Sequence, residues 1–207
     1  MKYLFIDTAT SNLVVALIID GNLKYYYNKQ TGKEMSEKII PVINEALEKA
    51  NINANQISKI VAVNGPGSFT GIRVGLTVAK TMAWSLKIPV IPISSLEVIA
   101  SATPFAENIA LIDARRDYVY AGKYDDNLNA LMQDSYIPLN SLETKYKFIS
   151  YDNIENSIKP EIDIIKVIKK HENETGINPH KLNPKYLKLT EAEEKINKEY
   201  DWEKWKN

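Results

Sequence analysis

The sequence contains no cysteine and only two histidines among its 207 residues. The absence of cysteine excludes disulfides, thiolate zinc sites and cysteine nucleophiles. The histidines, His171 and His180, are nine residues apart and outside any HExxH pattern, so they do not form a pair of zinc ligands on one helical turn. A chain without cysteine suits a reducing compartment. We therefore expect a cytoplasmic protein that uses neither a metal ion nor an organic cofactor.

Net charge and long apolar runs are also missing. Lys and Arg total 26, and Asp and Glu also total 26, which leaves no net charge to attract nucleic acid or anionic lipid over long range. No apolar run approaches the ~20 residues of a membrane-spanning helix, and Asp7 comes too early for a signal-peptide core. We expect no membrane association, and we expect any contact with RNA to be local or made through a partner.

The composition and the order of the patterns predict a globular α/β protein with two lobes. Apolar residues make up 44% of the chain and charged residues 25%, which is ordinary for a protein with a buried core. In the first lobe we expect strands at residues 2–6, 13–19, 23–27, 60–63 and 89–93, and helices at 34–50 and 69–86. Pro41 lies inside the first helix, so that helix either bends there or restarts one residue earlier. Strands at residues 108–113 and 118–124, spaced as a hairpin, begin a second lobe in the same way.

This order is typical of the actin-like (ASKHA) architecture. That architecture has two ribonuclease-H-like lobes, each built from a mixed sheet with flanking helices. We expect the first lobe over residues 1–103 and a reduced second lobe over 104–207. A charged C-terminal helix over 191–207 carries Trp202 and Trp205, which either pack back on the first lobe or dock a further component.

Three short motifs narrow the prediction. They are Asp7-Thr8-Ala9-Thr10, the run from Asn64 to Leu76 that includes Gly65-Pro66-Gly67-Ser68-Phe69-Thr70-Gly71, and Ile112-Asp113-Ala114-Arg115-Arg116. Together they resemble the TsaB (YeaZ) family, and the uninterrupted GPGSFTG string is the most specific of them. Ser94-Ser95-Leu96-Glu97 and Pro184-Lys185-Tyr186-Leu187-Lys188 also fit that family.

The resemblance implies a function in the modification of tRNA with threonylcarbamoyladenosine. In that family a TsaD-like subunit carries the catalytic chemistry, and a TsaE-like ATPase joins the assembly. The TsaB-like subunit is implied to be a non-catalytic, dimerising partner of TsaD. The resemblance therefore implies that this chain binds a TsaD-like catalytic subunit, forms a homodimer when alone, and contacts tRNA at most indirectly.

The residues that hold a nucleotide in related enzymes are altered here. Ala9 occupies the place of a glycine that would admit phosphate, and the turn after Asp113 contains no glycine. Asp7 and Asp113 nevertheless stand where related enzymes hold a metal-bound nucleotide. Either they bind Mg²⁺, which would favour a small kinase or ATPase, or each accepts hydrogen bonds from turn N–H groups at a strand end.

The turn between Gly65 and Gly71 also has two interpretations. A glycine turn that leads into a helix N-terminus can bind an anion, and Gly67 and Ser68 would then line the site. Alternatively, Gly67 and Gly71 let the turn pack tightly on a neighbouring strand, and Ser68 caps the helix. Asp7, Gly67, Ser68 and Asp113 are thus candidates for a vestigial or anion-binding site.

The helix over 69–86 carries more apolar surface than one sheet can cover. One stripe, which we assign to the core, consists of Phe69, Ile72, Leu76, Ala79, Ala83 and Leu86. A second row, Val74, Val78 and Met82, is turned well away from it, so that the apolar arc spans roughly 220° where about 100° suffices. The helix is therefore covered on two sides, either by the rest of the chain or by another molecule.

The neighbouring helix over 34–50 has a similarly broad apolar stripe, and the pair could form a four-helix bundle with an equivalent pair from another chain. On this interpretation the partner-binding residues are Met35, Ile39, Val42, Ile43, Ala46, Gly71, Arg73, Val74, Gly75, Val78 and Met82. Arg115 and Arg116 either touch tRNA phosphates or form a solvated turn. Besides an ATPase, a stand-alone homodimeric binding protein remains an alternative.

Overall fold

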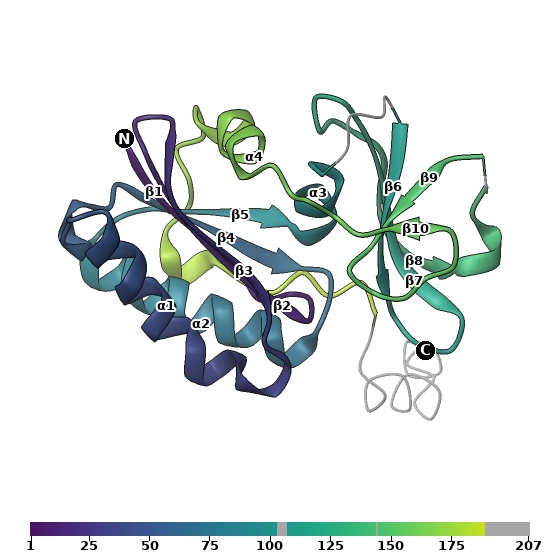
Figure 1. The fold of residues 1–207 in the computed structure, drawn as a ribbon, viewed down its shortest axis with the longest axis horizontal. Coiled ribbons are helices and arrows are strands. Elements are labelled where there is room, and N and C mark those ends of the chain that lie inside the picture. Colours follow the sequence, from purple (N-terminus) through teal and green to yellow (C-terminus); the bar gives the residue numbers. More distant parts are fainter. Residues whose placement is uncertain (103–106, 144, 189–207) are drawn as a thin grey trace, which may run out of the picture.

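The fold is that of a computed structural model, in which residues 1–102, 107–143 and 145–188 are described. It has two lobes, each with a five-stranded sheet (Figure 1). The predicted C-terminal helix with Trp202 and Trp205 lies outside the described residues, as does the expected boundary at residues 103 and 104. In the part of the chain that is described, no helix is both long and apolar enough to cross a bilayer.

The first sheet contains the five strands predicted in the N-terminal half of the chain. Its strands are β1 (Lys2–Asp7), β2 (Asn12–Ile19), β3 (Asn22–Gln30), β4 (Lys59–Gly65) and β5 (Val90–Ser94). They lie in the order β3-β2-β1-β4-β5; β1, β2 and β3 are antiparallel, whereas β4 runs parallel to β1 and β5 parallel to β4. Nearly all side chains of β1 and β2 are buried, because helices cover both faces of the sheet.

The second sheet repeats the connectivity of the first. Its strands are β6 (Glu107–Asp113), β7 (Tyr118–Asp125), β8 (Ala130–Pro138), β9 (Lys147–Ile149) and β10 (Ser157–Ile158). The order is β10-β9-β6-β7-β8, with an antiparallel β6-β7-β8 meander and β9 parallel to β6. The two lobes therefore share the ribonuclease-H-like topology, and the second is reduced, since β9 and β10 have only three and two residues.

Within the described residues, four α-helices flank the sheets: α1 (Met35–Lys49), α2 (Phe69–Leu86), α3 (Ser95–Ala100) and α4 (Ile164–His171). Short 3₁₀ turns are η1 (Gly32–Glu34), η2 (Ala54–Gln56), η3 (Leu139–Ser141) and η4 (Pro179–Lys181). α1 is assigned as one helix through Pro41, which lies on its exposed side, where water can replace the missing hydrogen bond. In Figure 1, α1 and α2 lie on one side of the first sheet and α4 on the other.

After β10 the chain returns to the first lobe. Ile164, Val167 and Ile168 of α4 are buried in the same hydrophobic core as the first sheet. Ile177 then pairs with Val90 at the free edge of β5, and Leu182 is buried. The sequence patterns did not predict α4, because its eight residues are too few for a clear period. The segment from α4 to Leu182 thus packs on the first lobe although it follows the second in sequence.

Candidate functional site

The glycine turn between β4 and α2 packs directly on the turn between β1 and β2. A Cβ atom added to Gly67 would overlap the carbonyl group of Ala9, and the φ angle of Gly67 is +148°. The backbone N–H of Ser68 donates to the Ala9 carbonyl oxygen at 2.8 Å. Ser68 Oγ accepts from the N–H of Gly71 at 3.2 Å, as an N-cap does. These contacts are the ones that the packing and capping interpretation of this turn predicts.

The first two turns of α2 lie against Thr8. The Thr8 hydroxyl donates to the carbonyl oxygen of Gly71 at 2.7 Å. A Cβ on Gly71 would overlap the Thr8 carbonyl oxygen, and a Cβ on Gly75 would overlap Thr8 Oγ1. Both glycines are buried. They allow close packing inside the first lobe, and this corrects the prediction that Gly71 and Gly75 let a partner approach.

Asp7 ends β1 and has an exposed fraction of 1%. Its Oδ1 accepts a hydrogen bond from the N–H of Ala9 at 2.8 Å, which confirms the predicted turn. Burial raises the pKa of Asp7 to about 6, although the Ala9 hydrogen bond opposes the shift. The buried carboxylate is therefore destabilising at neutral pH.

Replacing Asp7 should reveal this penalty. Because the pKa of Asp7 is higher in the folded state than in the unfolded chain, folding is favoured at low pH and loses stability as the pH rises from about 4 through 6. Asp7→Asn keeps an acceptor for the Ala9 N–H without the charge. We expect it to stabilise the fold by roughly 2–3 kcal/mol at pH 8 and to have little effect near pH 4, as measured by urea denaturation. An equal effect on stability at both pH values would contradict a raised pKa for Asp7.

The turn between β6 and β7 is built around Asp113. Three consecutive residues, Arg115, Arg116 and Asp117, have φ angles of 66°, 57° and 61°, in the left-handed region. Asp113 Oδ1 accepts from the N–H of Arg115, and Asp152 Oδ2 accepts from the N–H of Asp113, both at 2.8 Å. Asp113 is thus a turn residue, as predicted. Desolvation raises the pKa of Asp152.

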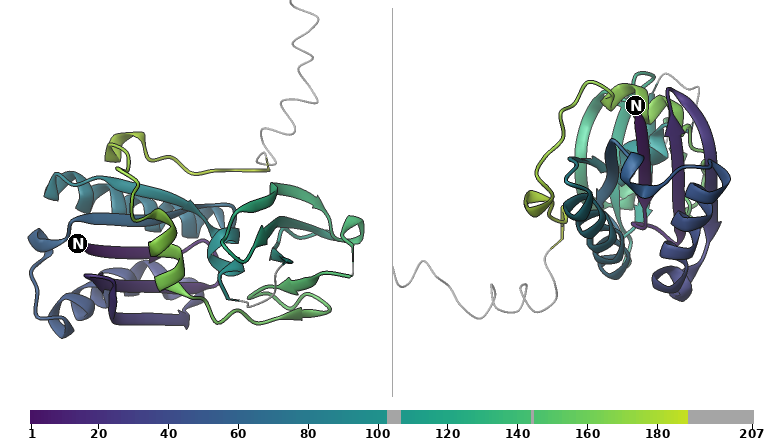
Figure 2. Two further views of the ribbon diagram at one scale, coloured as in Figure 1. Left: turned by 90° about the horizontal axis from the view of Figure 1, so that it is seen from above. Right: turned by 90° about the vertical axis from the view of Figure 1, so that its left-hand side faces the viewer.

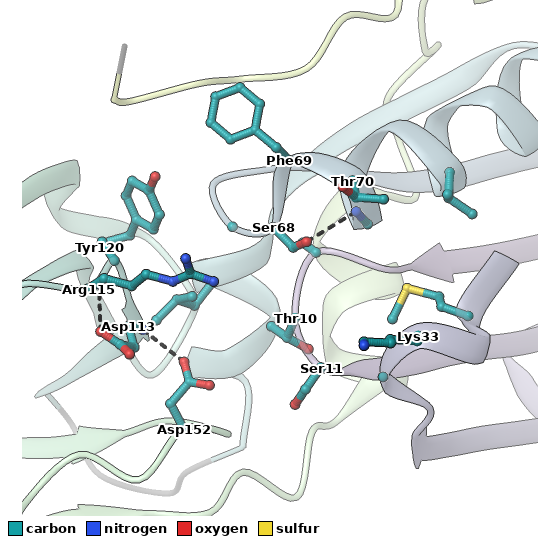
Figure 3. A pocket seen from close by; sticks show the side chains of 18 of the residues that line it. Thr10, Ser11, Lys33, Ser68, Phe69, Thr70, Asp113, Arg115, Tyr120 and Asp152 are labelled. Atoms are coloured by element: carbon teal, nitrogen blue, oxygen red, sulfur yellow. Dashed lines mark hydrogen bonds between the residues drawn. The ribbon is translucent and has the colours of Figure 1, made fainter. Parts of the chain in front are cut away.

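These turns line a cavity of about 820 Å³ between the lobes. Its charged lining residues are Lys33, Asp113, Arg115, Asp152 and Lys188. Figure 3 shows Arg115 and Lys33 reaching toward the cavity from opposite sides, with Ser68 and Thr10 between them. Gly67, Ser68 and Asp113 line this cavity, whereas Asp7 does not. The structure therefore does not bring Asp7 and Asp113 together in one pocket.

Three backbone donors at this cavity already have acceptors within the chain. The N–H of Ala9 donates to Asp7, that of Ser68 to the Ala9 carbonyl, and that of Arg115 to Asp113. A phosphate cradle requires such N–H groups to point at the ligand. Among the described residues, no group of three or more His, Asp or Glu side chains is placed to hold a metal ion. These three N–H groups therefore hold the turns together and do not point at a ligand in the cavity.

The residues expected to bind a partner divide into two groups. The exposed fractions of Met35, Ile39, Val42, Ile43 and Ala46 are between 0% and 7%. These five α1 residues belong to the core of the first lobe, which corrects their prediction as partner-binding residues. Val74, Val78 and Met82 are only half-buried, and Arg73 is exposed. The apolar row of α2 therefore remains partly uncovered by its own chain.

Sequence reasoning gave no role to several residues at the junction of the lobes. Lys185 donates through its N–H to the Asn64 carbonyl at 2.7 Å and through Nζ to Asp134 Oδ2 at 3.0 Å. Tyr186 stacks on Phe69, with 4.2 Å between ring centroids. The motif around Lys185 thus ties the first lobe to β8. Asp134 and Asp152 were missed because they lie in or after strands whose patterns are weak.

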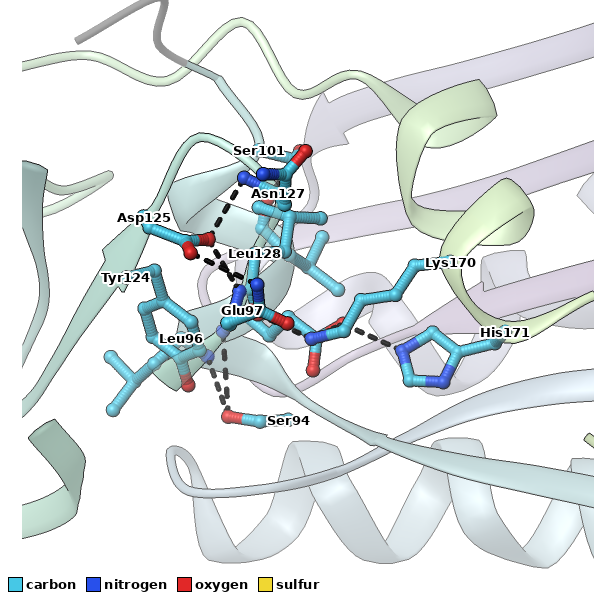
Figure 4. Close-up of polar contacts among 12 residues, drawn as sticks. Ser94, Leu96, Glu97, Ser101, Tyr124, Asp125, Asn127, Leu128, Lys170 and His171 are labelled. Atoms are coloured by element: carbon cyan, nitrogen blue, oxygen red, sulfur yellow. Dashed lines mark hydrogen bonds and ion pairs between the residues drawn. The ribbon is translucent and has the colours of Figure 1, made fainter. Parts of the chain in front are cut away.

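A second polar cluster joins α3 to α4 (Figure 4). His171 Nε2 lies 2.6 Å from Glu97 Oε1, and His171 Nδ1 lies 2.6 Å from Glu174 Oε1. Lys170 Nζ is 3.3 Å from Glu97 Oε1 and also donates to the Leu128 carbonyl. Burial lowers the pKa of His171, but the hydrogen bonds and charges of Glu97 and Glu174 outweigh it, so the pKa lies above its ordinary value. When the imidazole is protonated, each ring nitrogen donates to one of the two carboxylates.

This cluster predicts a pH-dependent stability. Since the pKa of His171 is raised on folding, the imidazolium stabilises the fold fully below about pH 6.5, and this contribution is lost as the pH rises through the raised value. We expect His171→Gln to destabilise the fold by about 2 kcal/mol near pH 6 and by less near pH 9, measured by urea denaturation. Equal destabilisation at both pH values would show that the imidazolium makes no special contribution.

The chain is similar in sequence to known proteins. Residues 28–147 match the family model described as TsaD, tRNA N6-adenosine threonylcarbamoyltransferase. The chain is 38% identical over 126 residues to the tRNA threonylcarbamoyladenosine biosynthesis protein TsaB of Bacillus subtilis, an alignment that covers 60% of this chain and 55% of that protein. It is 31% identical over 152 residues to the protein of the same name from Buchnera aphidicola subsp. Schizaphis graminum. That alignment covers 70% of this chain and 72% of the relative.

A solved structure has the same fold. YeaZ from Pseudomonas aeruginosa superposes with a TM-score of 0.77 at 21% identity, over 90% of this chain and 99% of that one. By contrast, the alignments span about half the length of the first curated relatives, 55% for Bacillus subtilis and 52% for Haemophilus influenzae.

Proposed function

Because the chain belongs to the TsaB (YeaZ) family, we propose that it is a non-catalytic subunit that binds a TsaD-like protein and supports threonylcarbamoyl transfer to adenosine in tRNA. A TsaE-like ATPase would join through the complex, and the chain would form a homodimer when alone. The curated relatives are named for biosynthesis of this modified nucleoside.

The observation that carries the proposal is the uncovered apolar row of α2. Val74, Val78 and Met82 are half-buried, and Ile40 on the neighbouring α1 is 46% exposed. Two adjacent helices with spare apolar surface suit packing against an equivalent pair. A standard interface buries about 800 Å² on each partner, with aromatic, Met and Arg anchors near its centre. Met82 supplies an adaptable side chain there, and Arg73 lies at the rim.

The non-catalytic part of the proposal rests on the interlobe cavity. The N–H groups of Ala9, Ser68 and Arg115 already have acceptors within the chain. A nucleotide would have to break these turns to reach the same donors. This argument favours a binding subunit over a small kinase or ATPase that uses Asp7 and Asp113.

The test is co-purification with the TsaD homologue of the same genome. We expect a stable heterodimer by size-exclusion chromatography with light scattering, and threonylcarbamoyl transfer by the TsaD homologue only in the presence of this chain. The absence of both would overturn the proposal. Titration of the isolated chain with Mg-ATP in a calorimeter tests the rival function, since micromolar binding would support an ATPase.

A further inference from the structure

Positive charge is concentrated in two segments of this chain, whose net charge is zero. Residues 49–96 include five Lys or Arg residues and no Asp or Glu, and residues 175–188 include three lysines and His180 but again no acid. The second segment follows the first by nearly 80 residues, so the sequence does not reveal whether they share a surface. A basic stripe on one face is the usual electrostatic footprint of a nucleic-acid-binding protein.

The tertiary structure places these two segments side by side. η4 packs on α2, and Arg73 Nε donates to the Tyr186 hydroxyl at 2.9 Å. Figure 2 shows the chain after α4 running along the outer side of α2 toward the second lobe. The α2 part of the first basic segment therefore adjoins the second segment.

The exposed side of α2 carries the cations in a line. Five residues follow one another at spacings of four, three, four and three, which places them on one side of the helix. They are Arg73, Thr77, Lys80, Trp84 and Lys87. The line is about 21 Å long at 1.5 Å per residue. It ends at Lys87, whose left-handed φ of 57° closes the helix. This line and the adjacent Lys181 are called the basic stripe below.

A cavity of about 800 Å³ opens beside the basic stripe, between the end of α2 and residues 176–180. Trp84 lines it and is 63% exposed, a high value for the largest aromatic side chain. Lys87, Asn178 and His180 supply polar groups around the ring, and no carboxylate lines the cavity. The stripe thus combines cations with an open aromatic face.

The charges of the stripe are not neutralised within the described residues. None of the ion pairs there includes Arg73, Lys80, Lys87 or Lys181. Lys185 differs, since Asp134 pairs with it at 3.0 Å, and it is left out of the stripe. The face therefore retains cations that a polyanion can use.

We propose that the basic stripe binds RNA directly, with Lys80, Lys87 and Lys181 on phosphates and Trp84 stacked on an unpaired base. The identity of that RNA as tRNA rests on the proposed function. Arg73 borders both surfaces, but Trp84 and Val78 are about 120° apart around the helix, so RNA stacked on Trp84 leaves the apolar row of α2 free. One helix can then hold a protein partner on one side and the RNA on the other.

An acidic protein segment is the other polyanion to consider. Lysine is depleted in protein interfaces, whereas this face is rich in it. Cations interleaved with an exposed aromatic ring are typical of single-stranded nucleic-acid sites, where each stacked base contributes substantially to affinity. The composition therefore favours RNA.

The test is fluorescence polarisation with an in vitro tRNA transcript over a salt series, using the full chain alone and together with the TsaD homologue. The triple variant combines Lys80→Gln, Lys87→Gln and Lys181→Gln. It should weaken tRNA binding at least tenfold at low salt, and the slope of the log of the binding constant against log salt concentration should fall in magnitude by about two. Trp84→Ala should weaken binding about tenfold with little change in slope.

The matched control removes the same charge elsewhere. The control variant combines Lys24→Gln, Lys147→Gln and Lys169→Gln, at exposed positions of β3, β9 and α4. It should bind tRNA with the same affinity as the parent chain. Equal losses in both triple variants would overturn the proposal, because binding would then depend on net charge alone. Binding of polyglutamate at the stripe without binding of tRNA would identify a protein occupant and also overturn it. Failure of the parent chain to bind the TsaD homologue concerns only the proposed function.

Discussion

Gly71→Ala is expected to destabilise the protein by about 3 kcal/mol, even though alanine favours a helix by about 1 kcal/mol relative to glycine. Gly71 lies in the first turn of α2 with ordinary helical geometry. Whether alanine stabilises or destabilises the fold there therefore depends on the atoms that its Cβ would meet. The added Cβ would overlap the Thr8 carbonyl oxygen, a backbone atom that cannot rotate away. α2 would have to move off the β1–β2 turn, and the buried side chains of Ile72 and Leu76 would lose part of their packing.

Urea denaturation and calorimetry of Gly71→Ala measure this effect, with an expected fall in Tm of roughly 10 °C. Gly75→Ala should be milder, because its Cβ would meet the hydroxyl of Thr8, a side chain that can rotate. Gly21→Ala is the control, since no atom lies within 4 Å of the added Cβ and only its φ of +77° opposes the change, at about 1 kcal/mol. If Gly71→Ala is no less stable than Gly21→Ala, the close contact between α2 and Thr8 does not exist.

Val78→Asp is expected to abolish association with the TsaD-like partner, with a loss in affinity of at least about a hundredfold. Val78 is the middle residue of the uncovered row of α2, with Val74 and Met82 one turn away on either side. A carboxylate there would be desolvated in the interface without a counter-charge, and this is strongly unfavourable. In the free chain Val78 is only half-buried, so the carboxylate can remain hydrated and the fold should persist.

Thr77→Asp provides the matched control. It adds the same charge to the same helix, but Thr77 is exposed and turned about 100° away from Val78. Calorimetric titration with the TsaD homologue should therefore show normal affinity for Thr77→Asp and none for Val78→Asp, while circular dichroism reports that both are folded. Should Val78→Asp unfold, Met82→Gln gives a second variant of the row. Normal partner affinity in a folded variant of the row would rule out this face as the interface.

Much of the first lobe was predictable because its signals are local. The Asp20-Gly21-Asn22 turn between apolar runs predicts a hairpin, and β2 and β3 pair around it. Ser68 and Ser94 stand where N-cap residues belong, and both accept hydrogen bonds from the N–H groups of the helix that follows. The motif resemblance then extended the prediction to the second lobe, whose β9 and β10 are too short to be recognised by pattern.

The sequence alone determined the elements of the first lobe, the capping of α2 and α3, and the surplus apolar width of α2. These features depend on residues a few positions apart, so spacing suffices to predict them. Only the tertiary structure decided which surfaces are covered. It buried Met35 and Ile39 in the core, placed Gly71 against Thr8, and brought His180 and Lys87 to the lining of one cavity. These contacts join residues that are far apart in the sequence. The spacing of neighbouring residues therefore cannot predict them.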